Sequence, residues 1–477
     1  MGPVPDTDDA PRPATAPSPA GTTADRSAPG PRSVPGPRSV PGPPPAPRAD
    51  APSPVAPRRT GAASPEARRV PTAHHVPPAH HVPPAHHVPP ARRLAAALRD
   101  RPWLTVLLVW LASRIVTTLV VAVVEASTRG WSWRDADGGP GVLGLLSSWD
   151  GVWFREIATQ GYPADLPVDG EGRVQKNAWA FLALYPAVVR AVTTVTGLPF
   201  EVAGVAVSVV AGGAAALVLH RLLERRVGPR AALWGTVFFC ANPMSVVLQA
   251  TYAESLSLLF TFAALLALDR RRIGAFTVLT VLAAATRPGA LALSAVLVVT
   301  TVLRLVRGER LPLREHLATW SAAVVTIAAG VAWPVVADLA TGTSGAYLLT
   351  ETAWWRSYVD HEGSFVPFTP WFVMASQWLG PVGPVLVVLV VGAMAWAVLF
   401  RTRRLGLTLL LWAGAHVGYL VAVFLPQHST FRMLLPLSPL FGQPWLSATR
   451  RRALVVLGTC VALQPVVVLL LWVVWPP

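Results

Sequence analysis

The sequence predicts an all-α protein that crosses a membrane many times, and three observations carry this prediction. Of the 477 residues, 52% are hydrophobic and only 14% are charged, whereas soluble domains carry about 25% charged residues. The mean hydropathy is +0.46. Beyond residue 95 the chain consists of apolar runs separated by short arginine clusters, and a run of about 20 apolar residues can cross a bilayer as a helix.

The same observations exclude several classes of protein. A soluble globular enzyme does not fit so apolar a chain. The net charge of +15 comes mainly from arginines between the apolar runs, which is typical of cytoplasmic loops and not of a nucleic-acid-binding domain. Only two cysteines occur, Cys240 and Cys460, and both lie within apolar runs. Buried free thiols are therefore expected, which excludes a secreted disulfide scaffold and a cysteine metal site.

A polar tail occupies residues 1–95, where proline and alanine dominate and the segment AHHVPP occurs three times. Such a composition offers little apolar surface to bury, so we expect the tail to be disordered. Four arginines lie between residues 92 and 101, just before the first apolar run. The positive-inside rule therefore places the tail in the cytoplasm. The histidine pairs of the tail could bind a metal ion, but a repeat-expanded linker is the simpler interpretation.

Residues 96–477 are expected to form one transmembrane domain of about ten to twelve helices, counted from the apolar runs and their arginine borders. The run 103–124 leads outward to a polar loop at 125–177, and a second external loop is expected at 337–370. Residues 178–197 contain an internal arginine, so we expect a helix there that inserts only halfway from the outer side.

Two further runs, 231–268 and 273–306, have arginines at both ends, and each is long enough for a pair of short helices. Because arginine clusters mark the cytoplasmic side, each pair is expected to go out and return. The midpoints of both runs then lie at the outer face of the membrane.

Polar and charged residues in or beside a membrane are costly, which makes them candidates for function. The expected topology brings such residues from five separate segments to the outer face. They are Asp150, Glu156, Tyr185, Glu254, Arg287, His428 and Arg432. Arg114 is different, because it lies in the middle of the first apolar run.

The segment SSWDGVWFREIATQGYP, residues 147–163, is the central element of this set. Trp149 and Trp153 are spaced to lie on one face of a short helix at the membrane surface. Asp150 lies between them and could act as a general base toward a sugar hydroxyl. An ordinary helix N-cap, for which aspartate is favoured, explains Asp150 equally well.

Five motifs then follow one another in an order that resembles the PIG-V family, the GPI mannosyltransferase II-like enzymes of the GT-C glycosyltransferase class. The motifs are WDGVWFREIATQGYP, WAFLALYPAVVR, NPMSVVLQATYAESL, TRPGAL and FRMLLPLSPLF. The usual FPLYP of the family reads LALYP here, so one proline is lost and the local backbone can differ. It is the order of all five that makes the resemblance specific.

The resemblance implies a GT-C-like helical bundle with an external first loop and a polyprenyl- or dolichyl-phosphate-linked mannose donor. It also implies an inverting transfer on the non-cytoplasmic face, with Asp150 as the catalytic base. The chain has no P-loop and no GxGxxG segment after a strand. An enzyme without a nucleotide-sugar domain needs a donor delivered on a lipid, which independently favours the same donor class.

The arginines suit the phosphate of such a donor, because a guanidinium binds phosphate with two parallel hydrogen bonds. Arg287 and Arg432 are at the right depth, and Arg114 is included as a third candidate. The alternative for the first two is contact with lipid headgroups. The alternative for Arg114 is a buried ion pair with Glu125 or Glu254.

The remaining candidates are assigned to substrate binding, each with an alternative. Glu254 could bind acceptor hydroxyls or help to hold a divalent ion, or it could be a helix N-terminal acid. Tyr185 and Tyr252 could stack on a sugar ring or anchor the protein at the interface. His428 could assist proton transfer or have a structural role. Trp149 and Trp153 complete the predicted substrate-binding set.

Two other functions compete with glycosyl transfer. A transporter or flippase of a lipid-linked sugar would also need many apolar helices and buried arginines, and a non-catalytic family member would keep the same fold. The sequence does not identify the acceptor, which is expected to be a glycolipid or a glycan. The stretch 342–369 offers an aromatic and acidic acceptor platform that includes Trp354, Trp355, Arg356, Tyr358, Asp360 and His361.

Overall fold

In the computed structural model, the first apolar run forms α2 (Pro102–Ser127), a helix of 26 residues. At 1.5 Å per residue this helix is about 39 Å long, more than the hydrocarbon core of a bilayer. Proline stands in its first turn, where the missing backbone N–H would have no partner in any case. Trp110 is buried on one face, whereas Ile115 is 63% exposed on another, as expected of a helix that faces lipid.

The structure describes residues 101–129, 139, 141–359 and 365–474, all within one unit that spans 84–477. The predicted tail at 1–95, its histidine pairs, and Asp360 and His361 of the predicted acceptor platform lie outside the described residues.

Within these ranges the chain is helical, with a single isolated bridge between Val168 and Val174, so the predicted all-α membrane class is confirmed. Five described helices are long and apolar enough to cross a membrane, and three more are apolar but shorter. The long ones are α2, α6 (Phe200–Val227), α11 (Leu313–Thr341), α14 (Val382–Arg401), and α17 (Arg450–Val468) with its π-helical continuation η5 (Leu469–Val474). The short ones are α9 (Ile273–Ala284), α10 (Leu291–Val306) and α15 (Leu407–Val423). The predicted count of about ten to twelve crossings exceeds the five described helices that are long enough to cross, and it stays a prediction.

The two predicted pairs of short helices are present. The first consists of α7 (Pro229–Ala241) and α8 (Glu254–Asp269), joined by a segment that contains the 3-10 turn η2 (Ser245–Leu248). The second consists of α9 and α10, joined by residues 285–290. These joining segments carry the polar residues that the sequence analysis singled out.

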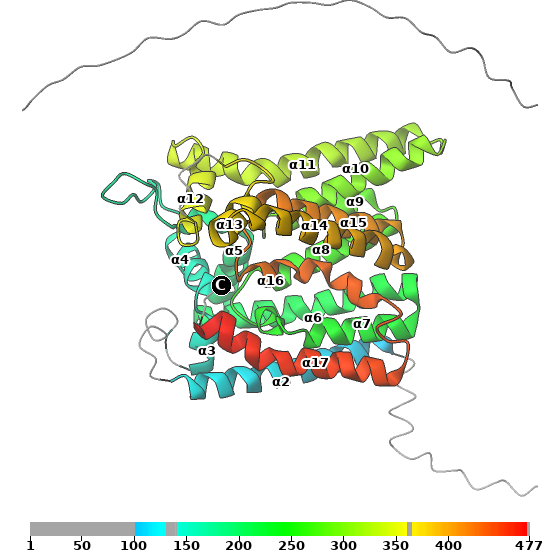
Figure 1. The fold of residues 1–477 in the computed structure, drawn as a ribbon, viewed down its shortest axis with the longest axis horizontal. Helices are drawn as coiled ribbons and strands as arrows, with labels where there is room; N and C mark the ends of the chain where they lie inside the picture. Colours follow the sequence, from blue (N-terminus) through cyan, green and yellow to red (C-terminus); the bar gives the residue numbers. More distant parts are fainter. Residues whose placement is uncertain (1–100, 130–138, 140, 360–364, 475–477) are drawn as a thin grey trace, which may run out of the picture. The chain divides into compact units, whose positions relative to one another are not determined.

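Several short helices gather at one end of the long ones, toward the left of Figure 1. They are α3 (Gly141–Leu146), α4 (Asp150–Gln160), α5 (Leu184–Thr196), α12 (Ala346–Trp355) and α13 (Pro370–Leu379). The 13 residues of α5 are too few to cross a bilayer, as predicted for residues 178–197. Tyr185 and Val189 of α5 are buried, whereas Val195 is 86% exposed.

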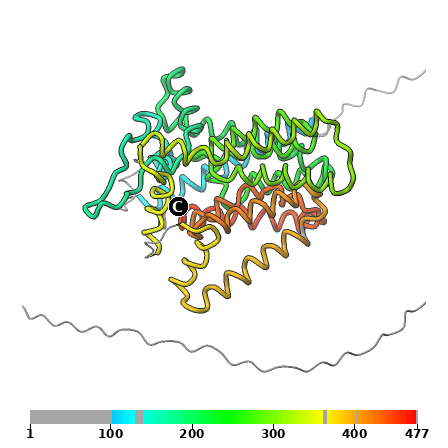
Figure 2. Tube along the Cα trace, turned by 90° about the horizontal axis from the view of Figure 1, so that it is seen from above, coloured from blue at the N-terminus to red at the C-terminus, as the bar shows by residue number. Residues whose placement is uncertain are grey.

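Two apolar runs in the C-terminal part of the chain are not single continuous α-helices. Residues 371–400 are divided between α13 and α14 at Gly380, which has a φ of 57°, and Figure 2 shows this segment beside the other helices. Residues 433–446 contain the end of α16 (Thr430–Met433) and the 3-10 segment η4 (Leu435–Gly442). Prolines 436 and 439 explain η4, because proline lacks the N–H that an α-helix requires.

Candidate functional site

The site begins at Asp150, the first residue of α4, whose side chain is buried. Trp149 precedes it with a φ of 60°, a conformation that bulky residues rarely adopt and that often marks functional sites. The Trp149 indole donates a hydrogen bond to the carbonyl of Trp472 at 3.0 Å, which holds this turn in place. No side chain caps α4, so the Asp150 carboxylate is not used as an ordinary helix cap.

A close approach between α4 and the segment that leads into α8 positions this carboxylate. The backbone N–H of Thr251 donates to the Leu146 carbonyl at 2.9 Å. Gly151 follows Asp150, and a Cβ at this position would collide with the Thr251 side chain. Glycine therefore allows Asp150 to lie beside Glu254, which is the first residue of α8.

Two arginines hold the Asp150 carboxylate. Arg432 Nη1 lies 2.5 Å from Oδ2 and Arg432 Nη2 lies 3.2 Å from Oδ1, so this pair is bidentate. Arg287 Nη1 lies 3.5 Å from Oδ2. Arg287 also donates to the Met433 sulfur at 3.6 Å, which connects the turn between α9 and α10 to α16.

The same arginines contact Glu254. Arg287 Nη2 lies 3.2 Å from Glu254 Oε1, and Arg432 Nη1 lies 3.6 Å from it. The Glu254 side chain is 5% exposed, and its Oε2 has no hydrogen-bond partner among the described residues. Two carboxylates and two guanidiniums from four segments thus form one buried, charge-balanced cluster, which we call the arginine–carboxylate cluster. Burial of charged groups is costly even when they are paired. The cluster is therefore a candidate for function.

Tyr252 packs against the cluster. Its ring lies 5.4 Å from the Arg432 guanidinium and stacks on Trp472 at 5.3 Å. Tyr252 is 0% exposed, so neither face of its ring is open to a ligand in this structure. Tyr185 is equally buried, and its hydroxyl contacts the Gly204 carbonyl and Ser208, both at 3.1 Å. Helix packing encloses both rings in this structure, and their stacking on a sugar stays a prediction.

Arg114 is also placed differently from the prediction. Its guanidinium donates to the carbonyls of Ser245 at 2.7 Å and Cys240 at 2.8 Å, and lies over the Trp110 ring. Weaker bonds to Ser113 and Gln249 occupy its remaining donors. Arg114 therefore holds the segment between α7 and α8 and is not part of the arginine–carboxylate cluster. No ion pair with Glu125 or Glu254 is seen within the described chain.

Trp153, one turn after Asp150, borders a partly exposed aromatic surface. Its ring stacks on Phe181 at 5.9 Å and meets the edge of Trp354 at the same distance. The ammonium of Lys176 lies over the Trp354 ring. Trp354 belongs to the predicted acceptor platform, whereas Trp355 of the same helix is buried. The structure thus brings Trp153 and Trp354 together near Asp150.

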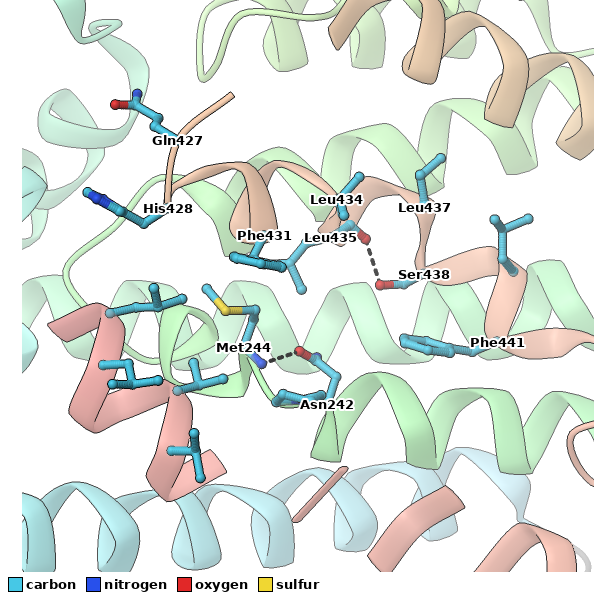
Figure 3. Close-up of a pocket in the computed structure, with 16 residues that line it drawn as sticks. Asn242, Met244, Gln427, His428, Phe431, Leu434, Leu435, Leu437, Ser438 and Phe441 are labelled. Carbon is cyan, nitrogen blue, oxygen red and sulfur yellow. Dashed lines mark hydrogen bonds between the residues drawn. The ribbon is translucent and has the colours of Figure 1, made fainter. Parts of the chain in front are cut away.

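An apolar cavity of about 740 Å³ is lined by Phe431 and Leu434, the neighbours of Arg432 and Met433 in the sequence. Phe431, the residue before Arg432, lines it, and Figure 3 shows His428 and Gln427 toward one end and Phe441 toward the other. Its walls come from residues 242–244, α16, η4, α17 and η5. His428 lines the cavity and contacts the Tyr358 ring edge-on at 5.4 Å.

Sequence reasoning missed Glu351 and its neighbours. Glu351 lies on α12, is partly buried, and accepts a hydrogen bond from Tyr347 one turn earlier. It also interacts electrostatically with Arg287 and Asp150. Burial raises the pKa of Glu351 to about 7, although the Tyr347 hydroxyl and Arg287 favour its charged form. No motif surrounds this glutamate, and its position in an acid-containing segment that is predicted to be external was the only signal.

A metal site was left open by the sequence. In the part of the chain that the structure describes, no three histidine, cysteine, aspartate or glutamate side chains are grouped to hold a metal ion. The carboxylates of Asp150 and Glu254 face guanidinium groups instead.

Comparison with known proteins supports the predicted resemblance. A family model described as mannosyltransferase (PIG-V) matches residues 104–307, a range that includes Asp150, Glu254 and Arg287. GPI alpha-1,6-mannosyltransferase 2 of Homo sapiens is 31% identical over 145 residues, which cover 28% of this chain and 27% of that protein. The Cricetulus griseus protein of the same name is 32% identical over 161 residues, which cover 32% and 30%.

The match spans less than a third of the length of these relatives. A crystal structure of ArnT from Cupriavidus metallidurans bound to undecaprenyl phosphate is also similar, with 17% identity and a TM-score of 0.43. That similarity covers 75% of this chain and 62% of the ArnT chain.

Proposed function

We propose that this chain, whose resemblance to the PIG-V mannosyltransferases is confirmed over residues 104–307, is a membrane glycosyltransferase. It transfers a mannosyl residue from a polyprenyl-phosphate-linked donor to a glycolipid or glycan hydroxyl, with inversion, on the non-cytoplasmic face. The observation that carries the proposal is the buried arginine–carboxylate cluster beside an apolar cavity. The names of the two mammalian relatives suggest the sugar.

The donor fits the two parts of this site in one orientation. Its phosphodiester carries one negative charge and suits Arg287 and Arg432, which supply charged donors in a largely dry environment. Its isoprenoid chain suits the apolar cavity, which begins at Phe431 next to Arg432. The sugar then lies on the side of Asp150 and Glu254.

The reaction is a single displacement at the anomeric carbon. The acceptor hydroxyl attacks this carbon as the bond between the carbon and the phosphate oxygen breaks. The hydroxyl proton passes to the Asp150 carboxylate, and the lipid phosphate leaves with a second negative charge. Arg287 and Arg432 stabilise that charge as it develops, which is where fixed donors accelerate a reaction most.

Donor binding has to change the contacts of Asp150. Without the donor, both carboxylate oxygens accept hydrogen bonds from Arg432. A phosphate between the arginines competes for these donors and frees one Asp150 oxygen for the acceptor proton. In this account the carboxylates keep the arginines in place until the donor arrives. The aromatic surface of Trp153 and Trp354 is available to the incoming acceptor.

The proposed function is tested by glycolipid and glycan profiling of a strain that lacks the gene. We expect the loss of at least one mannosylated product and the accumulation of its unmannosylated precursor, both restored by the intact chain. Restoration by the Asp150→Asn variant at normal expression, or an unchanged glycan profile, would argue against the proposal.

Narrowing the apolar cavity is expected to weaken binding of long-chain donors selectively. Val467→Trp places an indole among the side chains that line the cavity. We expect the KM for a long-chain donor to rise about tenfold, because lost burial of one or two methylenes costs about 0.8 kcal/mol each. A citronellyl-phosphate donor should be affected less. Val385→Trp, at a 59% exposed position on α14, is the matched control. An equal rise in KM for both donors would mean that the isoprenoid chain of the donor does not bind in this cavity.

Arg114→Met is expected to lower the free energy of unfolding without changing donor affinity. The buried carbonyls of Cys240 and Ser245 lose charged hydrogen-bond donors, and each unsatisfied group costs about 1–3 kcal/mol. The measurement is the unfolding free energy together with the donor Kd of the folded protein. If the variant has normal stability but no longer binds the donor, Arg114 contacts the donor phosphate, as the sequence predicted.

A further inference from the structure

The segment that carries Arg432 is held by two side chains of α15. Trp412 Nε1 donates a hydrogen bond to the carbonyl of Pro436 at 2.9 Å, and His416 Nε2 lies 2.9 Å from the carbonyl oxygen of Met433. A carbonyl oxygen only accepts hydrogen bonds, so His416 Nε2 carries a proton and donates it. Both side chains are buried, and because they lie four residues apart they share one face of α15.

Proline explains why the Met433 carbonyl takes a side-chain partner. The backbone stays helical at Leu434, with a φ of −83° and a ψ of −10°, so an N–H at position 436 would bond this carbonyl in a 3-10 turn. Pro436 has no N–H, and the N–H of Leu437 donates to the Leu434 carbonyl instead. His416 therefore satisfies an acceptor that the local sequence leaves open.

Met433, the residue that His416 holds, is connected to both arginines of the arginine–carboxylate cluster. It follows Arg432 in the chain, and Arg432 makes the bidentate contact with Asp150 at 2.5 and 3.2 Å. The sulfur of Met433 accepts a hydrogen bond from Arg287 at 3.6 Å. The hydrogen bond from His416 thus fixes a residue that is covalently bonded to one arginine and in contact with the other.

A third residue on this face of α15 lies against the turn that carries Arg287. Tyr419 is three residues after His416, and a Cβ built on Gly289 would lie 3.4 Å from its ring. Gly289 has a φ of 114°, a conformation that favours glycine. Helix α15 therefore contacts the backbone on both segments that supply the arginines.

We propose that His416 is a positioning residue for the donor phosphate, and that it sets the separation of Arg287 and Arg432 through the carbonyl of Met433. The inference rests on the proposed function, because it requires these arginines to stabilise the phosphate as it leaves. His416 acts through Met433 and does not need to touch the donor. Fixed donors matter most where charge develops, so loss of this hydrogen bond should slow transfer more than it weakens donor binding.

The test compares His416→Met with His416→Gln in nanodiscs, by the kcat of mannose transfer and by the donor Kd measured without acceptor. The two replacements are similar in length, but only glutamine has an N–H that can donate to the Met433 carbonyl. For His416→Met we expect kcat to fall about ten- to a hundredfold and the donor Kd to change less than about threefold. For His416→Gln we expect a kcat within about threefold of the normal value, because the donor is kept.

The matched control is Trp412→Phe, which removes the other hydrogen bond between α15 and this segment. Its acceptor, Pro436, belongs to η4 and not to the arginine–carboxylate cluster. Trp412→Phe should lower the Tm about as much as His416→Met does, but keep kcat within about threefold of normal. Equal losses of kcat in the two variants, or in His416→Met and His416→Gln, would overturn the inference, because His416 would then act only through the stability of the fold.

A double-variant cycle gives a readout that a general loss of stability does not change. In the Arg432→Lys background no guanidinium remains at position 432, so adding His416→Met should lower kcat by less than about threefold. A fall as large as in the unchanged background would overturn the inference and leave the proposed function intact. If the unchanged protein does not transfer mannose, the proposed function fails and the inference fails with it.

Pro436→Ala keeps the test decisive if His416→Met does not fold. Alanine restores an N–H at position 436, which can donate to the Met433 carbonyl in a 3-10 turn. The double variant His416→Met with Pro436→Ala should therefore fold and have a kcat within about threefold of the normal value, since the carbonyl again has a partner. Folded double-variant protein with a kcat more than about tenfold below normal would contradict the role of the His416 hydrogen bond.

Discussion

Asp150→Asn is expected to reduce mannosyl transfer by about 100- to 10,000-fold, the usual contribution of a general base. Asparagine keeps the shape of the side chain and can still accept one hydrogen bond from Arg432, but it cannot take the acceptor proton. The measurement is the initial rate of polyprenyl phosphate release by the variant. The comparison requires that the variant has the same Tm as the unchanged protein. Asp150→Glu should also cost on the order of a hundredfold, because it displaces the carboxylate.

The control for Asp150→Asn is Asp169→Asn in the same predicted loop, 125–177, where the carboxylate pairs with Arg173 near the surface. This variant should transfer at nearly the normal rate. If Asp150→Asn also transfers within about twofold of the normal rate, its role is structural, and Glu254 becomes the next candidate for the base.

Arg432→Gln is expected to have the second largest effect, on stability and on donor binding together. Arg432 is 8% exposed and contacts both cluster carboxylates, and removal of one partner from a buried ion pair costs about 3–5 kcal/mol. We therefore expect a lower Tm and a donor Kd raised at least about tenfold, since one bidentate phosphate contact is lost. Arg432→Lys should recover part of the stability but little of the affinity, because lysine lacks the planar fork.

The double variant Asp150→Asn with Arg432→Gln separates these two effects. Neutralising both partners leaves no unpaired charge between them, so it should be more stable than the sum of the single changes implies. Transfer should remain as low as in Asp150→Asn. Stability losses that simply add would mean that the bidentate contact does not contribute to the fold.

The sequence predicted the features of this structure that follow from the transfer of apolar and charged groups between water and the membrane. Long apolar runs require helices in a membrane, and arginine borders correctly indicated that 231–268 and 273–306 form pairs of short helices. The cost of membrane charges also pointed to Asp150, Glu254, Arg287 and Arg432, which the structure brings into one cluster.

The sequence could not show how individual polar groups are satisfied. Arg114 looks like a ligand-binding residue until the carbonyls of Cys240 and Ser245 are seen to occupy it. Tyr185 and Tyr252 have the composition of a sugar-binding surface, but long-range packing buries both. Glu351 was missed for the opposite reason, since only tertiary structure brings α12 near Arg287.

The most direct test of the account is mannose transfer by the purified chain, reconstituted with polyprenyl-phosphate-mannose and a lipid extract as the source of acceptors. We predict equimolar polyprenyl phosphate and mannosylated product, with inverted anomeric configuration and dependence on the Asp150 carboxylate. Intact donor recovered after binding, or donor that is moved across the membrane without cleavage, would contradict the account.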